Sequence, residues 1–182
     1  MSEMIVCIYR FFENAISQTS CCAFLFLWFF FLGNHGAIAE EIGTTYSAAV
    51  VSIIDGDSLE VRYNGINRQI RLWGIDAPEW NQPHAYLAKR LLQSMLLGRK
   101  VVVEPYYLDD YKRVIAQVYR EHQNINQLLI ERGYAWVHIY YCKKDICDEW
   151  RKLQARARGR KAGLWGNRQA IPPWRWKRMK RR

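Results

Sequence analysis

Acidic residues are absent from the C-terminal part of the chain. Residues 150–182 contain 13 Lys and Arg and no Asp or Glu, whereas residues 40–149 contain 13 basic and 15 acidic residues. The net charge of +10 therefore comes from one end of the chain. A basic segment without counter-charges of its own indicates a polyanionic partner, such as nucleic acid, an anionic membrane or an acidic polysaccharide. The alternative is a solvated charge run that only aids solubility.

Long apolar runs are also missing. The run at residues 21–32, CCAFLFLWFFFL, has 12 residues, fewer than the roughly 20 that a membrane-spanning helix requires. The small residues Ala37 and Ala39 follow it in the arrangement of a signal-peptide cleavage site. We therefore predict a signal peptide at residues 1–39 and an exported protein, periplasmic or extracellular. An uncleaved N-terminal anchor is the alternative.

Cysteine is scarce. The sequence has five, of which Cys7, Cys21 and Cys22 fall inside the predicted signal peptide and only Cys142 and Cys147 remain. In an oxidising compartment an isolated pair favours a disulfide, which here would close a short local loop. Two thiolate ligands of a metal ion are the alternative, but no His stands at a zinc-ligand spacing from this pair.

The pattern of apolar residues predicts one domain of the α+β class. Alternating and β-branched stretches, with an Asn64-Gly65 hairpin turn, predict five strands near residues 50–54, 59–63, 67–73, 101–103 and 113–119. Residues 135–140 form a further short extended run. Apolar residues at helical spacing predict about three helices, ending at or near Gly98, Gly133 and Gly163. This order fits a five-stranded Greek-key barrel of the OB type with helical cover.

We place this domain at residues 40–166. Residues 167–182 combine Pro172-Pro173 and two tryptophans with basic residues, and no periodicity continues into them. They are therefore predicted to form a basic tail that is extended and mobile without a partner.

Residues 54–80 place ionisable side chains at strand ends. Asp57, Asp76 and Glu79 supply three carboxylates and Arg71 supplies a guanidinium. Two carboxylates with a main-chain carbonyl and waters make a set of oxygen ligands that Ca²⁺ accepts. Arg71 can bind a phosphate bidentately, and Glu79 can hold or deprotonate a water. Each of these short segments, taken singly, is also typical of an ordinary turn or helix cap.

In combination these segments resemble the signature of the staphylococcal nuclease (thermonuclease) family. The matching motifs are Asp55-Gly56-Asp57, Arg71-Leu72, Ile75-Asp76-Ala77-Pro78-Glu79, Asp109-Asp110-Tyr111-Lys112-Arg113, NQLLIERGYA at 126–135 and Lys161-Ala162-Gly163-Leu164-Trp165. The resemblance extends from residue 47 to residue 166. It implies a Ca²⁺-dependent nuclease that hydrolyses single- and double-stranded DNA and RNA without strong sequence preference and leaves 3′-phosphate ends. A catalytically weak module of the same fold that binds nucleic acid or another polyanion is the alternative.

The resemblance also implies roles for the acidic residues. Asp57 and Asp76 match the carboxylates that bind Ca²⁺, and Ala77 stands where the family supplies a main-chain carbonyl ligand. Glu79 matches the glutamate that positions or activates the attacking water.

On the substrate side, Arg71 and Arg113 match the arginines that hold the scissile phosphate, and Tyr111 matches a tyrosine near the bound nucleotide. Lys112 stands where the family commonly has a glycine. A positive φ would explain a glycine there, and Lys adopts such a φ less readily. The basic tail would then add affinity for polyanions or contact an anionic envelope surface, and we expect a monomer.

Overall fold

The computed structural model of the protein describes residues 42–180. The predicted signal peptide and its cleavage site lie outside these residues. Within them, no helix combines the length and the apolar character that crossing a membrane would require.

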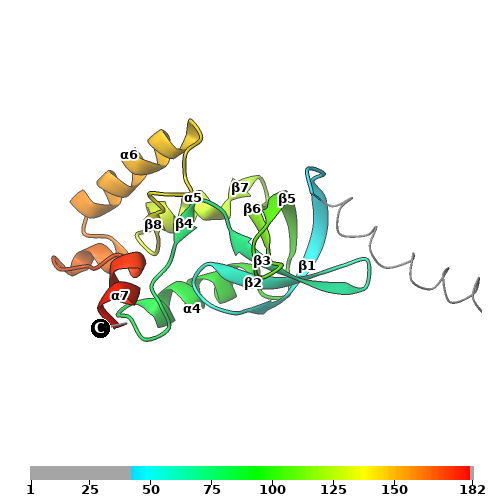
Figure 1. Ribbon diagram of the computed structural model, residues 1–182, viewed down its shortest axis with the longest axis horizontal. Helices are drawn as coiled ribbons and strands as arrows, with labels where there is room; N and C mark the ends of the chain where they lie inside the picture. Colours follow the sequence, from blue (N-terminus) through cyan, green and yellow to red (C-terminus); the bar gives the residue numbers. More distant parts are fainter. Residues whose placement is uncertain (1–41, 181–182) are drawn as a thin grey trace, which may run out of the picture. The chain divides into compact units, whose positions relative to one another are not determined.

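Five strands close a barrel, as predicted (Figure 1). Antiparallel ladders join β1 to β2, β2 to β3, β1 to β5 and β5 to β6, and a parallel pairing of β3 with β6 closes the circle. The barrel strands are β1 (Tyr46–Ile53), β2 (Ser58–Tyr63), β3 (Ile66–Leu72), β5 (Lys100–Leu108) and β6 (Val114–Arg120). Closure leaves the barrel with no long unpaired edge that could pair with another chain.

Three pairs of residues form short additional strands. β7 (Gln123–Asn124) pairs antiparallel with the end of β6, and β4 (Ile75–Asp76) pairs with β8 (Trp136–Val137) in a small separate sheet. The predicted extended run at 135–140 is therefore a strand at only two residues. Its pairing fixes the position of β4, which carries one of the candidate site residues.

The turn between β2 and β3 follows directly from the sequence. Asn64 and Gly65 both have positive φ, 49° and 78°. Two consecutive residues with positive φ are what a tight hairpin turn needs to match the twist of its strands, and Asn-Gly accepts this at low cost. The turn sets the register in which Ser58 pairs with Arg71, so it also determines where Arg71 lies.

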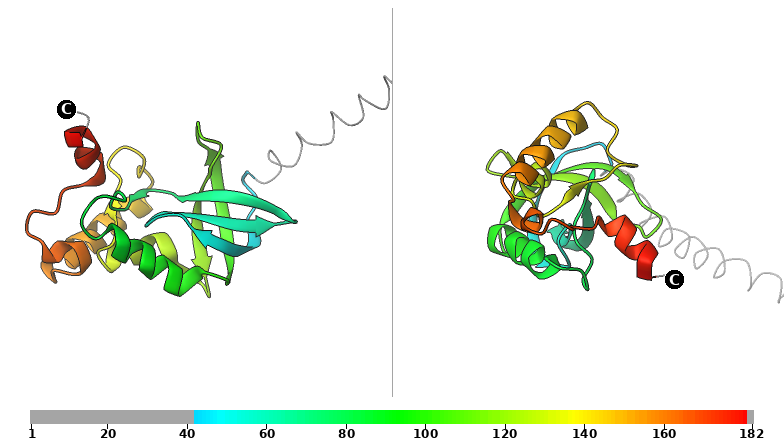
Figure 2. Two further views of the ribbon diagram at one scale, coloured as in Figure 1. Left: turned by 90° about the horizontal axis from the view of Figure 1, so that it is seen from below. Right: turned by 90° about the vertical axis from the view of Figure 1, so that its left-hand side faces the viewer.

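The three predicted helices are present and a fourth follows them. They are α4 (Ala85–Leu96), α5 (Ile125–Glu131), α6 (Ile146–Gly159) and α7 (Pro173–Lys180), with a 3₁₀ helix η1 (Gly163–Gly166) between the last two. Figures 1 and 2 show α5, α6 and α7 gathered at one end of the barrel. The helix α4 packs against β1 and buries Ala88, Leu92 and Leu96.

The prediction of an extended tail is wrong, because residues 173–180 form α7. Proline suits the first turn of a helix, where its missing N–H has no helical partner, and the carbonyl of Pro172 accepts hydrogen bonds from the N–H groups of Arg175 and Trp176, both at 3.0 Å. The helix is also docked: the indole Nε1 of Trp176 donates to the side chain of Asn81 at 2.9 Å. These contacts over long sequence distances give order to a segment whose composition alone suggests disorder.

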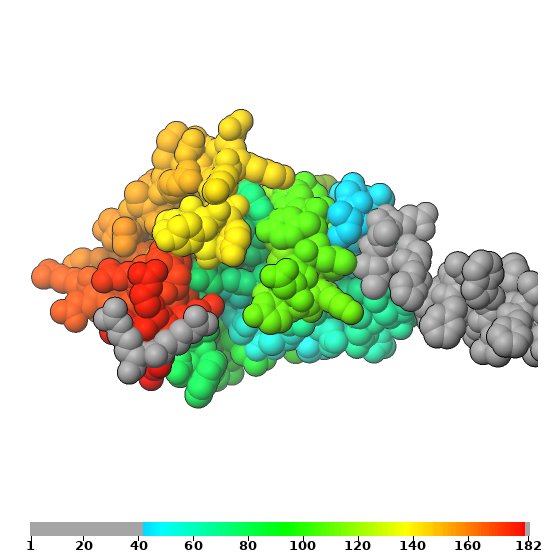
Figure 3. Space-filling model, viewed as in Figure 1, coloured from blue at the N-terminus to red at the C-terminus, as the bar shows by residue number. Residues whose placement is uncertain are grey.

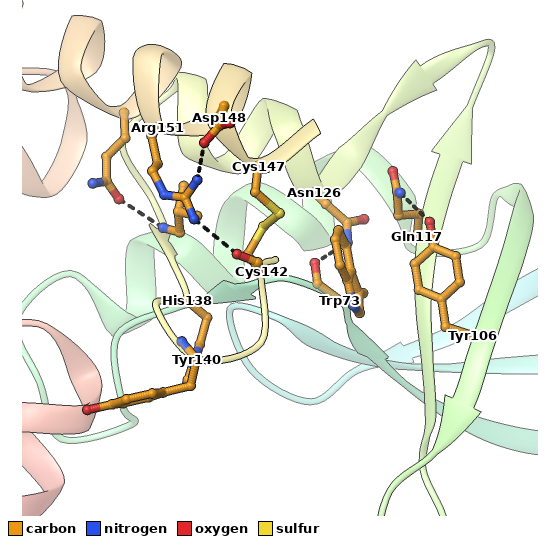
Figure 4. Close-up of a disulfide and its surroundings, with 12 residues drawn as sticks. Trp73, Tyr106, Gln117, Asn126, His138, Tyr140, Cys142, Cys147, Asp148 and Arg151 are labelled. Carbon is orange, nitrogen blue, oxygen red and sulfur yellow. Dashed lines mark hydrogen bonds and ion pairs between the residues drawn. A yellow bond between two sulfur atoms is a disulfide. The ribbon is translucent and has the colours of Figure 1, made fainter. Parts of the chain in front are cut away.

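The predicted disulfide joins Cys142 to Cys147 (Figure 4). Both cysteines are fully buried. Arg151 of α6 donates a hydrogen bond to the carbonyl of Cys142 at 3.1 Å and pairs with Asp148. The disulfide ties the loop after β8 to the first turn of α6. It lies close to Gly74, where an added Cβ would be 3.1 Å from the Cys142 sulfur.

Replacing both Cys142 and Cys147 by Ser is expected to lower the free energy of unfolding by about 2 kcal/mol, because the disulfide restricts the unfolded chain even over a short loop. Urea unfolding followed by tryptophan fluorescence measures this loss. Reductant should destabilise the wild type by a similar amount and leave the double variant unchanged. Equal stability of the oxidised wild type and the variant would contradict the prediction.

Candidate active site

The site is built around Arg71, which lies near the end of β3 and joins two buried carboxylates. Its guanidinium forms an ion pair with Asp57, just before β2, and a second one with Asp76 of β4 at 2.8 Å. Asp57 and Asp76 are 5% and 3% exposed. The three residues predicted from the sequence thus form one cluster, in which each charge has an opposite charge beside it.

A close approach of the chain holds Asp57 in this cluster. A Cβ added at Gly56 would lie 2.7 Å from the Ala77 methyl and 2.8 Å from the Ala88 methyl, so only glycine fits. The Ala77 N–H donates to the Asp57 carboxylate, and the Leu72 N–H donates to the Asp57 carbonyl at 2.9 Å. Asp57 is therefore fixed to β3 and to the β4 segment at once.

The cluster carries more negative than positive charge. Burial raises the pKa of Asp57 to about 7, and the carboxylates of Asp55 and Asp76 add to this rise against the effect of Arg71. Burial also raises the pKa of Asp76. Two buried carboxylates facing one guanidinium make a place where a further cation would be stabilised.

The donors available to such a cation are oxygens. Asp57, Asp76 and Ala77, which has a main-chain carbonyl to offer, all border the same cleft. Residues 42–180 contain no group of three or more His, Cys, Asp or Glu side chains arranged to hold a metal ion. The donor set thus suits a hard cation that takes its remaining ligands from water or substrate, as Ca²⁺ and Mg²⁺ do.

Arg113 lies on another wall of this cleft, and Asp109 orients it. The Asp109 carboxylate accepts from the Arg113 Nε at 2.8 Å, pairs with its Nη2 at 2.7 Å and also accepts from its main-chain N–H. These bonds lower the pKa of Asp109, although burial opposes them. Lys112 has a φ of 60°, so the turn keeps the positive φ that a glycine would adopt more easily.

The Tyr111 ring lies beside Arg113, with the guanidinium carbon 5.4 Å from the ring centroid. Tyr111 is 81% exposed, which leaves most of the ring open at the mouth of the cleft. A flat, exposed ring next to a cation can stack on a base.

Glu79 is in the loop after β4 and contacts Lys177, which was not among the site residues predicted from the sequence. Its carboxylate forms an ion pair with Lys177 of α7 at 2.8 Å. The pKa of Lys177 is raised in spite of burial, because Glu79 accepts its hydrogen bond and Asp76 lies nearby. The two residues are 98 positions apart in a segment predicted to be extended, so nothing in the sequence could have joined them.

All the predicted site residues border one cleft of about 820 Å³: Asp57, Arg71, Asp76, Ala77, Glu79, Tyr111 and Arg113. His138 borders it as well. Burial and the charges of Arg71 and Lys177 lower the pKa of His138 to about 4, so it is neutral near pH 7. The structure adds Asp109, His138 and Lys177 to the residues found from the sequence.

Comparison with known proteins agrees with this geometry. Residues 69–167 match the family described as Staphylococcal nuclease homologue. An "Uncharacterized endonuclease" of Escherichia coli is 36% identical over 132 residues, which are 72% of this chain and 84% of that protein. A "Micrococcal nuclease" of Shigella flexneri is 32% identical over 142 residues, 73% of this chain and 81% of that protein. The barrel, the shared motifs and these matches identify the chain as a member of the staphylococcal nuclease family.

Proposed function

We propose that the protein is a Ca²⁺-dependent phosphodiesterase that hydrolyses DNA and RNA, single- or double-stranded, without strong sequence preference. Membership of the family makes it a nuclease, a hydrolase of phosphodiester bonds. The observation that carries the finer proposal is the buried cluster of Asp57, Arg71 and Asp76, which opens onto a cleft shared with Glu79 and Arg113.

Each group has a role in this reaction. Arg71 and Arg113 bind the oxygens of the scissile phosphate and stabilise the charge that grows on them in the transition state. Glu79 accepts a proton from the attacking water. Asp57, Asp76 and the Ala77 carbonyl would hold Ca²⁺, which when bound supplies Lewis-acid charge to the phosphate.

The absence of sequence preference follows from the kind of contact that the cleft offers. Its cationic groups match phosphates, which every nucleic acid presents, and such contacts carry no sequence information. The exposed rings of Trp80 and Tyr111 at the cleft can stack on any base.

The alternative is a binding module with weak or no catalysis. The Lys177–Glu79 ion pair favours it, because it occupies the carboxylate that would act as the base. The buried carboxylates oppose it, because without a cation they would repel a phosphate. Tight binding of DNA with no cleavage under any divalent cation would support the alternative.

We further propose that the protein works outside the cytoplasm. The disulfide between Cys142 and Cys147 supports this, since such bonds persist in oxidising compartments. The basic residues of the C-terminal segment can also contact an anionic envelope surface. Flotation with anionic vesicles at low salt tests that contact, and a protein that stays in solution would argue against it.

The variant Arg113→Ala is expected to reduce kcat by about 10³–10⁵, the range seen when a phosphate-stabilising arginine is lost. DNA hydrolysis under saturating substrate measures the effect. Arg62→Ala is the matched control, because Arg62 is exposed on β2 and does not border the cleft. Turnover near that of the wild type in Arg113→Ala would show that Arg113 does not stabilise the transition state.

Ca²⁺ is expected to raise the melting temperature, and to raise it more at pH 8 than at pH 5.5. Because burial raises the pKa of Asp57 to about 7, the metal-free folded protein is stabilised by a proton on Asp57 at low pH. That contribution is lost as the pH rises towards 7, where the bare carboxylate becomes available to a cation.

A Ca²⁺ concentration of 100 times the Kd would add about 2.7 kcal/mol of stability. Asp76→Asn should lose most of the shift, whereas Asp148→Asn, on the exposed face of α6, should keep it. A shift that is equal at both pH values, or that survives Asp76→Asn, would show that Ca²⁺ binds elsewhere.

A further inference from the structure

One face of α7, its inner face, forms part of the wall of the active-site cleft. Trp174, Lys177 and Arg178, at positions i, i+3 and i+4 of the helix, all border the cleft. Arg175 and Lys180 are exposed and do not border it. Figure 3 shows this part of the molecule, with α7 in red beside the yellow segment around residue 138. The two segments are in contact there, since the ring centroid of Trp174 lies 5.5 Å from that of His138.

The helix is anchored to the loop that carries Glu79. Trp176 donates to Asn81, and the Gln82 side chain donates to the carbonyl of Ile171 just before α7. Gln82 is itself joined to Glu79, since its side-chain oxygen accepts from the Glu79 N–H at 3.1 Å. The position of the inner face of α7 is therefore set by the same loop that positions Glu79.

The charges that border the cleft indicate how this face helps a polyanion to enter. Six carboxylates border it, from Asp55, Asp57, Asp76, Glu79, Asp109 and Asp110. With all six ionised, as binding of a cation requires, Arg71 and Arg113 offset two of them, which leaves a charge of −4 without α7. Lys177 and Arg178 halve this to −2, and one divalent cation would bring the cleft to neutrality. A polyanion could not enter the cleft at −4 without a large electrostatic cost.

The two cations on the cleft side of α7, Lys177 and Arg178, are suitably placed to bind a phosphate. Lys177 uses one ammonium hydrogen on Glu79 and has three to donate. Arg178 forms no ion pair with any residue between 42 and 180. Both side chains are partly open to solvent, so a phosphate chain can reach them through the mouth of the cleft.

We propose that the inner face of α7 is a substrate-binding wall of the nuclease, in which Lys177 and Arg178 hold the sugar-phosphate chain of a polynucleotide opposite Arg113. Lys177 exchanges Glu79 for a substrate phosphate on binding, which frees the Glu79 carboxylate for the water. The inference deepens the proposed nuclease function and rests on it. The wall lies beyond residue 167, outside the segment that matches the family.

The test compares two double variants of the same helix that lose the same charge. Lys177→Gln with Arg178→Gln removes the inner pair, and Arg175→Gln with Lys180→Gln removes an outer pair. With single-stranded DNA of about 30 nucleotides, the inner variant should raise KM on the order of tenfold or more at 0.1 M salt, as expected for two lost phosphate contacts. Its slope of log KM against log salt should flatten by about 1.4.

The outer variant should change KM less than threefold, and the inner variant should change kcat less than threefold, because Glu79 remains in place. Equal increases of KM in the two variants would show a general charge effect and overturn the proposal. A collapse of kcat at unchanged KM would also overturn it, because Lys177 would then act on Glu79 and not on substrate. Melting temperatures near that of the wild type exclude loss of α7 as the cause.

A failure of the substrate-binding wall can be distinguished from a failure of the nuclease proposal. If the wild type does not cleave DNA with Ca²⁺, the nuclease proposal fails, and fluorescence anisotropy of labelled single-stranded DNA then tests the wall by binding alone. Weaker binding of the inner variant than of the outer variant supports the wall. Equal binding overturns it.

Discussion

The ion pairs of Arg71 with Asp57 and Asp76 are the interaction on which the site depends. Three separate parts of the chain must meet for them to form: the turn before β2, the end of β3 and the short strand β4. The Asn64-Gly65 turn sets the register of β2 and β3, and Gly56 lets the first segment approach Ala77. Loss of one partner from such a buried group leaves an uncompensated charge, which typically costs about 3–5 kcal/mol. The same cluster therefore joins these three segments, and its excess negative charge makes a place that a cation would stabilise.

The chemistry follows from how the charges are distributed around this cluster. Acidic groups gather where the proposed cation would bind, and cationic groups border the path that a phosphate chain would take. Asp109 keeps Arg113 oriented towards the cleft, and Lys177 neutralises Glu79 while no substrate is bound. The basic end of the chain is thus part of this balance through α7, in addition to any role of its outer residues at an anionic surface.

Local signals in the sequence predicted most of the fold. The Asn-Gly turn, the β-branched strands and the apolar faces of α4, α5 and α6 each act over a few residues, and all of them agree with the structure. The candidate site was predictable because Asp57, Arg71 and Asp76 stand near the ends of β2, β3 and β4, which follow one another in the sequence, and because the segments in combination resemble the staphylococcal nuclease signature. The helix α7 was missed because its order comes from tertiary contacts, of Trp176 with Asn81 and of Lys177 with Glu79. Composition alone cannot reveal such contacts.

The most direct test of the account is hydrolysis of single- and double-stranded DNA by residues 40–182, with Ca²⁺ or with a chelator, beside the variant Glu79→Gln. We expect cleavage of both substrates that requires Ca²⁺ and falls by about 10²–10⁴ in the variant, the usual contribution of a general base. Cleavage that persists in the chelator, or that is unchanged in Glu79→Gln, would show that the buried cluster and Glu79 do not form the active site.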